Sequence, residues 1–232
     1  MRKLICFPFA GAGASLFRPW AEALADTLVV TAVQLPGREN RFAEESYTQV
    51  EQAIDDLDAD LDALLDGATD ITLFGHSLGA VLAYELALRI DRAAPDLPCR
   101  LVVSGSPSPS RPRVQHASGL SDAQFLAQVR EFAGYSHPSL DDPEMRELLL
   151  PVLRADVEMH EAYSSHDKAP IGMPVIAVRG RDDELVSAAE LAAWQAVTTR
   201  PLQTLEVDGG HMYLTDHPQP LFGLLRQTMA LA

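Results

Sequence analysis

One serine lies in a pentapeptide that can turn its hydroxyl into a nucleophile. Residues 70–74 (DITLF) have the composition of a buried strand and lead directly into 75–79 (GHSLG), where a helical pattern begins. G-x-S-x-G between a strand and a helix is a tight turn that holds the serine hydroxyl out at the carboxyl end of a sheet. We therefore predict Ser77 as a nucleophile. His76 should point away from that hydroxyl, which indicates a structural role.

The base that such a serine requires is a histidine beyond a later strand. In proteins with this turn, the order along the chain is serine, acid, histidine. His211 ends the run 208–211 (DGGH), which follows an apolar strand pattern. It is favoured over His217, which lies where a final helix is expected to begin. The remaining histidines lie in a long insertion and are expected at the surface: His116, His137, His160 and His166.

The acid that orients the base is expected in residues 179–184 (RGRDDE), after another strand pattern. Asp182 and Asp183 are both candidates. Asp183 is favoured because it lies further past the strand, with room to turn toward the histidine. Ser77, Asp183 and His211 thus form the predicted catalytic triad.

The first apolar strand pattern leads into the glycine-rich run 6–15 (CFPFAGAGAS). A glycine-rich turn in this place often binds a negative charge, which could be a bound phosphate or an oxyanion formed during catalysis. A dinucleotide fingerprint requires a third glycine where this chain has Leu16, and no P-loop motif is present. An α/β-hydrolase instead builds an oxyanion hole from two backbone N–H groups, one after the nucleophile and one after an early strand. We predict Leu78 and Ala10 as these donors, with Phe9 as the alternative to Ala10.

Short apolar runs alternate with helical patterns along the chain, which predicts an α/β doubly wound, mostly parallel sheet with helices on both faces. The helix expected over 48–66 begins with a capping box of Thr48 and Glu51. The expected strands are 3–9, 28–35, 70–75, 100–105, 174–179 and 202–207, and the other expected helices are 15–26, 78–93, 187–198 and 219–231.

Residues 107–172 interrupt this alternation inside what we predict to be one domain, 1–232. The segment contains helical patches near 122–133 and 144–163. Insertions of this length are often lids over active sites. Its apolar side chains Leu126, Val129 and Phe132 are expected to shape an acyl chamber or to pack the lid.

Composition excludes several classes of partner. The chain has 232 residues, 47% hydrophobic and 22% charged, with a net charge of -15, which argues against nucleic acid and anionic membranes. The amino terminus lacks a convincing signal-peptide layout, so we expect a cytoplasmic protein. Cys6 and Cys99 show no metal or redox spacing and are expected to be reduced core thiols. We predict no bound metal.

Several motifs together resemble the type II thioesterases that accompany polyketide and nonribosomal peptide synthetases. They are PFAGAGAS, FRPWAEAL, AVQLPGRENR, FGHSLGA, LSDAQFL, LLLPVLRADVEMHEAY and GGHMYL, and they span nearly the whole chain. The resemblance implies an α/β-hydrolase fold with Ser77 as nucleophile, Asp183 as acid and His211 as base. It also implies hydrolysis of acyl thioesters on the phosphopantetheine arm of acyl or peptidyl carrier proteins, without a metal or redox cofactor. Relatives are thought to remove stalled or wrong acyl groups, and some release starter units or products.

The chain departs from the family pattern in two places near the expected acyl pocket. The family loop more often reads A-G-G-S where residues 12–15 read AGAS, and the family histidine is commonly followed by two phenylalanines where this chain has Met212 and Tyr213. Phe9 and Met212 are the expected substrate contacts. A small-molecule carboxylesterase and a non-catalytic carrier-binding module remain the alternatives.

Docking of a carrier protein is expected to need a local basic or apolar patch, because carriers of this family's partners are usually acidic and this chain is acidic too. Arg38, Arg41, Arg111 and Arg113 are the candidates for that patch, and the alternative for each is a solvated or loop-supporting arginine.

Overall fold

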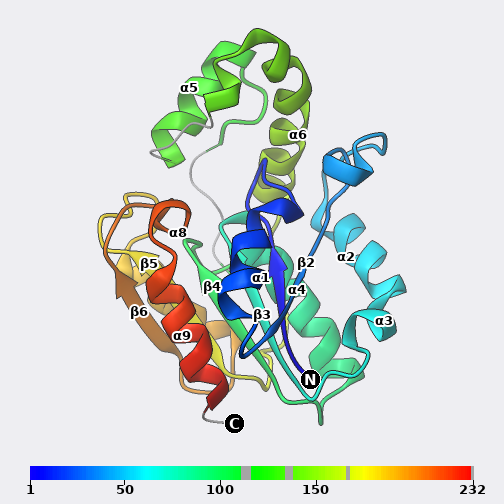
Figure 1. Ribbon diagram of the computed structural model, residues 1–232. Helices are drawn as coiled ribbons and strands as arrows, with labels where there is room; N and C mark the ends of the chain where they lie inside the picture. The colour runs from blue at the N-terminus through cyan, green and yellow to red at the C-terminus, as the bar shows by residue number, and fades with distance from the viewer. Residues whose placement is uncertain (111–115, 134–137, 166–167, 231–232) are drawn as a thin grey trace.

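The protein is built on a six-stranded parallel sheet (Figure 1). The computed structural model describes residues 1–110, 116–133, 138–165 and 168–230. All six predicted strands are present, in the spatial order β2-β1-β3-β4-β5-β6, with every neighbouring pair parallel. Their bounds are β1 Arg2–Phe7, β2 Val29–Ala32, β3 Asp70–His76, β4 Cys99–Ser104, β5 Val175–Gly180 and β6 Gln203–Val207.

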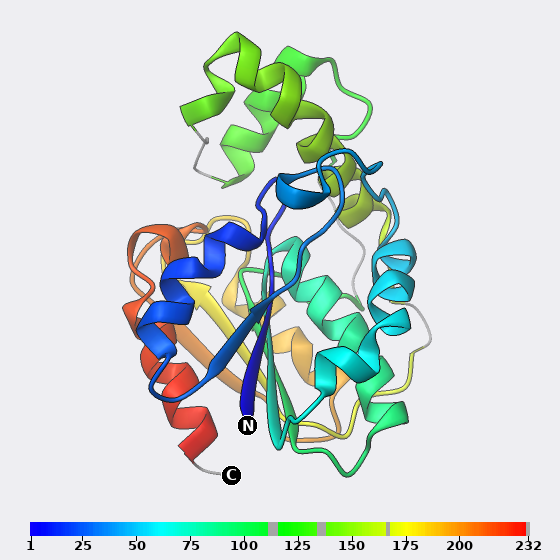
Figure 2. The same cartoon turned by 45° about the vertical axis from the view of Figure 1, so that its right-hand side comes forward.

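The central strands are apolar at successive positions, so that side chains on both faces of the sheet need helices to cover them. Ile71 and Leu73 face one core and Phe74 faces the other, and all three are fully buried. Continuous apolar strands of this kind are typical of parallel sheets with helices on both sides. Helices α2 (Val50–Ala59), α3 (Leu61–Leu65), α4 (Leu78–Ala93) and α7 (Ala188–Ala192) contribute to the first core, whereas α1 (Arg18–Leu24), α8 (Tyr213–Asp216) and α9 (Gln219–Ala230) contribute to the second (Figure 2).

Three of the expected helices differ from the prediction. The helix expected over 15–26 is a 3₁₀ segment, Ala14–Phe17, followed by α1. The helix expected over 48–66 is divided at Asp60 into α2 and α3. The predicted capping box is wrong by one residue, because the N-cap is Gln49 and the Gln52 side chain accepts hydrogen bonds from the Thr48 and Gln49 N–H groups at 3.2 Å. The helix expected over 187–198 is α7 followed by a 3₁₀ segment, Ala193–Val197.

The chain order makes a topological switch point at β1. From β1 the chain passes to β2 on one side and then returns to β3 on the other side of β1. Loops that leave β1 and β3 therefore diverge, and ligands of open α/β sheets bind at such a switch point beyond the carboxyl ends of the strands. Phe7 of β1 pairs in register with Gly75 of β3, so the glycine-rich run and the serine turn begin side by side.

The insertion lies beyond this same end of the sheet (Figures 1 and 2). It contains α5 (Asp122–Ala133), a 3₁₀ turn (Pro138–Leu140) and α6 (Pro143–Ala162). Leu126 is buried in a small separate core against which Val129 packs, as expected for side chains that pack the insertion, whereas the Phe132 side chain lies outside the described part. The buried members of this core are Ala117, Phe125, Leu126, Leu140, Leu150 and Leu153.

Among the helices of the described residues, none combines the length and the apolar character that crossing a bilayer requires.

The second core depends on an aromatic group centred on Trp20. Trp20 is 3% exposed, and its ring centroid lies 4.9 Å from Phe74, 5.1 Å from Phe222 and 5.3 Å from Phe17. We expect Trp20→Ala to lower the free energy of unfolding by about 3–5 kcal/mol, because it leaves a cavity between α1, β3 and α9. Urea denaturation followed by circular dichroism measures this change. Val29→Ala, at a side chain 46% exposed, is the control; equal losses in both variants would contradict the assignment.

Candidate active site

Ser77 occupies a strained turn between β3 and α4. Its backbone has φ +53° and ψ −115°, a conformation that a non-glycine residue rarely adopts. A Cβ at Gly75 would collide with the backbone of Gly79, and a Cβ at Gly79 would collide with the carbonyl oxygen of Phe7. Gly75 is therefore required for the turn to close on itself, and Gly79 is required for its close approach to β1, in keeping with the tight turn that the motif predicts.

His76 packs into the interior beside the predicted base. Its Nδ1 lies 2.9 Å from Ser104 Oγ, which lies 2.6 Å from the Tyr213 hydroxyl oxygen. The His76 and His211 ring centroids are 4.8 Å apart. Burial, together with the neighbouring His211, holds the pKa of His76 well below its usual value, so His76 is a neutral ring. The sequence did not point to Ser104 or Tyr213 as its partners, because each comes from a different part of the chain.

Asp183 and His211 form a buried hydrogen-bonded pair. His211 Nδ1 lies 3.0 Å from Asp183 Oδ2, and the two side chains are 8% and 0% exposed. The other carboxylate oxygen, Oδ1, accepts hydrogen bonds from the N–H groups of Leu185 at 2.9 Å and Val186 at 3.1 Å. A carboxylate held in this way fixes the orientation of the imidazole ring. Asp182, the alternative acid, is exposed.

Backbone hydrogen bonds hold the loops of the acid and the base together. The Asp182 N–H donates to Gly209 O at 3.0 Å, and the Arg181 N–H donates to Val207 O at 2.7 Å. Gly180 lies so close that an added Cβ would collide with the carbonyl oxygens of Gly209 and Gly210. The loops that follow β5 and β6 therefore approach each other as the sequence predicted. His217, the alternative base, is exposed at the end of α8.

The glycine-rich run forms a tight turn with N–H groups available for a ligand. The Ala12 N–H donates to Phe9 O at 3.0 Å, and Gly11 has φ +80°, a conformation that favours glycine. In the part of the chain that the structure describes, neither the Ala10 N–H nor the Leu78 N–H has a hydrogen-bond acceptor. The Phe9 ring packs edge-on against His76, with centroids 6.0 Å apart. Met212 directly follows the predicted base and is partly buried.

A buried ion pair supports this turn. Arg38 Nη1 and Nη2 donate to the two carboxylate oxygens of Asp156 at 2.5 and 2.7 Å, and the side chains are 8% and 0% exposed. Asp156 Oδ2 also accepts from the Gly11 N–H at 2.7 Å, and Arg38 Nη1 donates to Ala12 O at 3.1 Å. The pair therefore joins the loop after β1, the loop after β2 and helix α6.

Other residues of the loop after β2 hold the next part of the glycine-rich run. Gln34 Oε1 accepts from the Ala14 N–H at 3.1 Å. The Glu39 carboxylate accepts from the Ser15 N–H at 3.1 Å and from the Ser15 hydroxyl at 2.5 Å. The segment AVQLPGRENR is therefore a support for the run PFAGAGAS.

These contacts correct the expected docking patch. Arg38 is buried and fully engaged, so it is not available to a partner surface. Arg41 is 26% exposed and pairs with Glu44 and with Asp56. Both arginines support their loop, which was the alternative for each. The other two candidates, Arg111 and Arg113, lie outside the described residues.

Helix α6 is tied to its surroundings by the residues of the motif LRADVEMHEAY. Arg154 donates to Asp122 of α5 at 2.7 Å and lies over the Phe125 ring. Glu161 accepts from the N–H groups of Ala117 at 2.5 Å and Ser118 at 2.9 Å. The Tyr163 hydroxyl donates to Glu85 of α4, and this carboxylate also pairs with Lys168 at 2.5 Å.

The histidines of the insertion differ in their surroundings. His116 is exposed, with Nδ1 3.6 Å from Glu161 Oε2. The expectation that His160 is at the surface is wrong, because His160 is one of the buried residues of α6. His137 and His166 lie outside the described residues.

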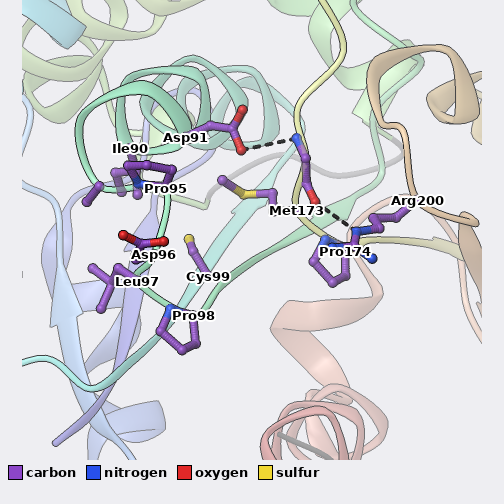
Figure 3. Close-up of a pocket in the computed structure, with 12 residues that line it drawn as sticks. Ile90, Asp91, Pro95, Asp96, Leu97, Pro98, Cys99, Met173, Pro174 and Arg200 are labelled. Carbon is purple, nitrogen blue, oxygen red and sulfur yellow. Dashed lines mark hydrogen bonds between the residues drawn. The ribbon is translucent and has the colours of Figure 1, made fainter.

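A groove of about 390 Å³ lies at the opposite end of the sheet (Figure 3). Cys99 begins β4 there, and Gly172 links the groove walls by donating its N–H to Asp91 at 3.1 Å and accepting from Arg200 at 3.0 Å. Burial raises the pKa of Cys99 to about 12, so the thiol stays protonated. Across residues 1–110, 116–133, 138–165 and 168–230, no group of histidine, cysteine and acidic side chains could hold a metal ion. The groove lies at the amino ends of β4 and β5, whereas Ser77 follows the carboxyl end of β3.

Comparisons with known proteins agree with one another. A family model described as a thioesterase domain matches residues 2–228. The gramicidin S biosynthesis protein GrsT of Aneurinibacillus migulanus is 34% identical over 213 residues, which cover 91% of this chain and 82% of GrsT. Thioesterase PikA5 of Streptomyces venezuelae is 34% identical over 214 residues, covering 92% of this chain and 76% of PikA5. The solved structure of BorB, a type II thioesterase from the borrelidin biosynthetic cluster, superimposes with a TM-score of 0.88 at 35% identity and covers 97% of this chain and 91% of BorB.

The match to the family model spans nearly the whole chain, and the two relatives exceed 30% identity over most of their length. The parallel sheet, its helical layers and the strand-turn-helix around Ser77 are those of an α/β-hydrolase. The chain belongs to the thioesterase family, whose members are serine hydrolases that act on thioesters.

Proposed function

We propose that this protein hydrolyses acyl groups from the phosphopantetheine arm of carrier proteins in a polyketide or nonribosomal peptide pathway, with Ser77, His211 and Asp183 as the catalytic triad. The observation that carries the proposal is the buried hydrogen bond between Asp183 and His211, beside a strained turn that presents Ser77. Relatives named for gramicidin S and borrelidin biosynthesis support the substrate class.

The reaction begins with proton transfer. His211 Nε2 takes the proton of the Ser77 hydroxyl, and the serine oxygen attacks the thioester carbonyl carbon. Asp183 keeps the proton of His211 on Nδ1, which leaves Nε2 as the base, and stabilises the imidazolium that forms. The negative charge that develops on the carbonyl oxygen is received by the N–H groups of Ala10 and Leu78.

The second half of the reaction releases both products. The C–S bond breaks, and the imidazolium gives its proton to the pantetheine sulfur, which leaves as a thiol. Water then attacks the acyl-serine while His211 accepts its proton. Collapse of the second tetrahedral intermediate returns that proton to Ser77 and frees the carboxylic acid. The protein supplies every group that these steps require, so no cofactor takes part.

The insertion acts as a lid in this proposal. Helices α5 and α6 stand over the end of the sheet that carries Ser77, and their small apolar core lies next to the turn at Gly11, where Leu153 is a close neighbour. Phe9 and Met212 flank the reacting groups and contact the first carbons of the acyl chain. Removal of stalled or incorrect acyl chains is the role that we propose for this activity.

The first test replaces the nucleophile. We expect Ser77→Ala to abolish deacylation while the circular dichroism spectrum stays unchanged, because no other hydroxyl occupies the turn. Intact-protein mass spectrometry of acyl carrier proteins, before and after incubation, measures conversion to the free phosphopantetheine thiol. Parallel assays with p-nitrophenyl esters separate a thioesterase from a small-molecule carboxylesterase. A folded Ser77→Ala variant with the wild-type rate would falsify the triad.

The second test distinguishes the two neighbouring acids. We expect Asp183→Asn to lower kcat by about 10⁴-fold, because an amide cannot hold the correct tautomer of His211 or stabilise its charged form. Asp182→Asn is the matched control and should stay within about twofold of the wild type, since this side chain is exposed. Stopped-flow or steady-state release of pantetheine thiol measures both variants. The reverse ranking would assign the orienting acid to Asp182.

The third test concerns the lid. We expect Leu126→Ala to change the ratio of kcat/KM for octanoyl and acetyl pantetheine by about 3- to 10-fold, because it alters the apolar core of the insertion. Leu148→Ala, at a side chain 69% exposed on α6, is the control. Identical selectivity in the wild type and the Leu126 variant would count against a lid that shapes the acyl site.

A further inference from the structure

We propose that Asp156 of α6, together with Arg38, is a positioning residue for the oxyanion hole. The inference rests on the proposed function, in which the Ala10 N–H is one of the two donors. Neither side chain reaches the reacting atoms. Each acts through the backbone turn that aims this N–H group.

The direction of the Ala10 N–H is set by the turn that contains it. Phe9 C=O and Ala10 N–H belong to the same planar peptide unit and point in opposite directions. Phe9 O accepts from the Ala12 N–H at 3.0 Å, so the Ala10 N–H points away from the inside of the turn. Any rotation of this peptide unit would break the bond to Ala12 and move the donor.

The ion pair holds this turn from both sides. Asp156 accepts from the Gly11 N–H, which belongs to the peptide unit directly after Ala10, and Arg38 donates to the carbonyl of Ala12, the last residue of the turn. The two side chains are themselves locked together by two hydrogen bonds in a buried site. The turn is thus fixed at two of its peptide units, Ala10–Gly11 and Ala12–Gly13, by charged groups that are bound to each other.

Stabilisation of an oxyanion requires that the glycine-rich turn be held rigidly. An oxyanion hole works only when its donors lie at about 2.7–3.1 Å from the position that the charged oxygen will occupy. A displacement of about 1 Å can cost roughly 100-fold in rate. A loop of small residues has no side chains of its own to hold it, and the Arg38–Asp156 pair supplies that rigidity.

A merely structural role for Asp156 makes a different prediction. Asp156 could serve only to attach α6, as Tyr163 does through Glu85, or only to stabilise the fold, as another buried ion pair does. That second pair is formed by Arg100 and Asp70. The Arg100 guanidinium nitrogens donate to Asp70 Oδ2 at 3.2 and 3.3 Å. Asp70 begins β3 at the opposite end from Ser77. Tyr163→Phe and Asp70→Asn are therefore matched controls for attachment and for stability.

The experiment compares Asp156→Asn with these controls in the full-length protein. Asparagine has the same size as aspartate. Both carboxylate oxygens of Asp156 accept hydrogen bonds from N–H groups, so the NH₂ group of the asparagine faces a donor in either orientation. We expect kcat for acyl pantetheine to fall by about 10- to 100-fold with KM changed less than about threefold, because ground-state binding is not affected. Active-site titration with a fluorophosphonate normalises each rate to folded, competent enzyme.

A second measurement reports on the hole itself. Butylboronic acid adds to the serine oxygen as a tetrahedral anion, and its affinity should fall by a factor similar to that of kcat. Arg38→Lys keeps the positive charge but loses the two-pronged contact, so we expect a smaller loss in the same direction. It also serves as the test variant if Asp156→Asn does not fold. Both control variants should retain kcat and boronate affinity within about twofold.

Three outcomes would overturn the inference. The first is a folded Asp156→Asn variant with wild-type kcat, or a folded Arg38→Lys variant with wild-type kcat if Asp156→Asn does not fold. The second is a reduced kcat with unchanged boronate affinity. The third is an equal loss of kcat in Tyr163→Phe. Each of these outcomes leaves the proposed function intact as long as Ser77→Ala is inactive. Full activity of Ser77→Ala would instead refute the proposed function, independently of Asp156.

Discussion

The buried ion pair between Arg38 and Asp156 is the interaction that holds together the segments at the end of the sheet that carries Ser77. It joins residues that are 118 positions apart and brings three segments to one point: the glycine-rich turn, the loop after β2 and helix α6. Taking two charges out of water is costly, and apolar replacements of buried pairs are often as stable or more so. What the pair provides here is a fixed geometry, because the same two side chains also bind the Gly11 N–H and the carbonyls of Ala12 and Pro36.

The sheet topology explains why the proposed catalytic groups meet at this end. The switch point between β1 and β3 places the glycine-rich turn next to Ser77, and the loops after β5 and β6 carry Asp183 and His211 to the same edge. Two of these contacts require that no side chain be present, at Gly79 against β1 and at Gly180 against the loop of His211. The backbone approaches itself closely at both places, and the side chains of the proposed triad lie beside these contacts.

The sequence was sufficient for the parts of the structure that local patterns encode. The six strands and the Ser77 turn follow from apolar runs and from one pentapeptide, and the hydrogen bond of His211 to Asp183 agrees with the preferred acid and base. Patterns of this kind extend over a few residues, which is why they are readable without a structure.

The differences from the sequence-based predictions concern partners that are distant in the chain and the exact position of a helix cap. Arg38 was a candidate for a docking patch, with loop support as the alternative, because its partner lies in a distant helix. His160 was expected at the surface because the packing of α6 on the domain is not visible in the sequence. The cap of α2 was displaced by one residue, since Gln52 competes with Glu51 for the same backbone donors. The motif around Asp156 did carry a signal. Its spacing puts Asp156 and Glu161 on one helix and Tyr163 directly after it, and each of the three binds a different segment.

The anchoring of α6 means that the insertion is not an interchangeable module. Asp156 binds an arginine from the loop after β2, and Tyr163 binds a glutamate from the middle of α4, so both partners lie well before residue 107 in the chain. Recombination between relatives with crossover points at the ends of the insertion would pair each anchor with residues of another protein. A transplanted helix without a carboxylate at position 156 would leave buried Arg38 without its partner and the Gly11 N–H without its acceptor. The residues at positions 38 and 85 therefore have to be matched to the helix in any such chimera.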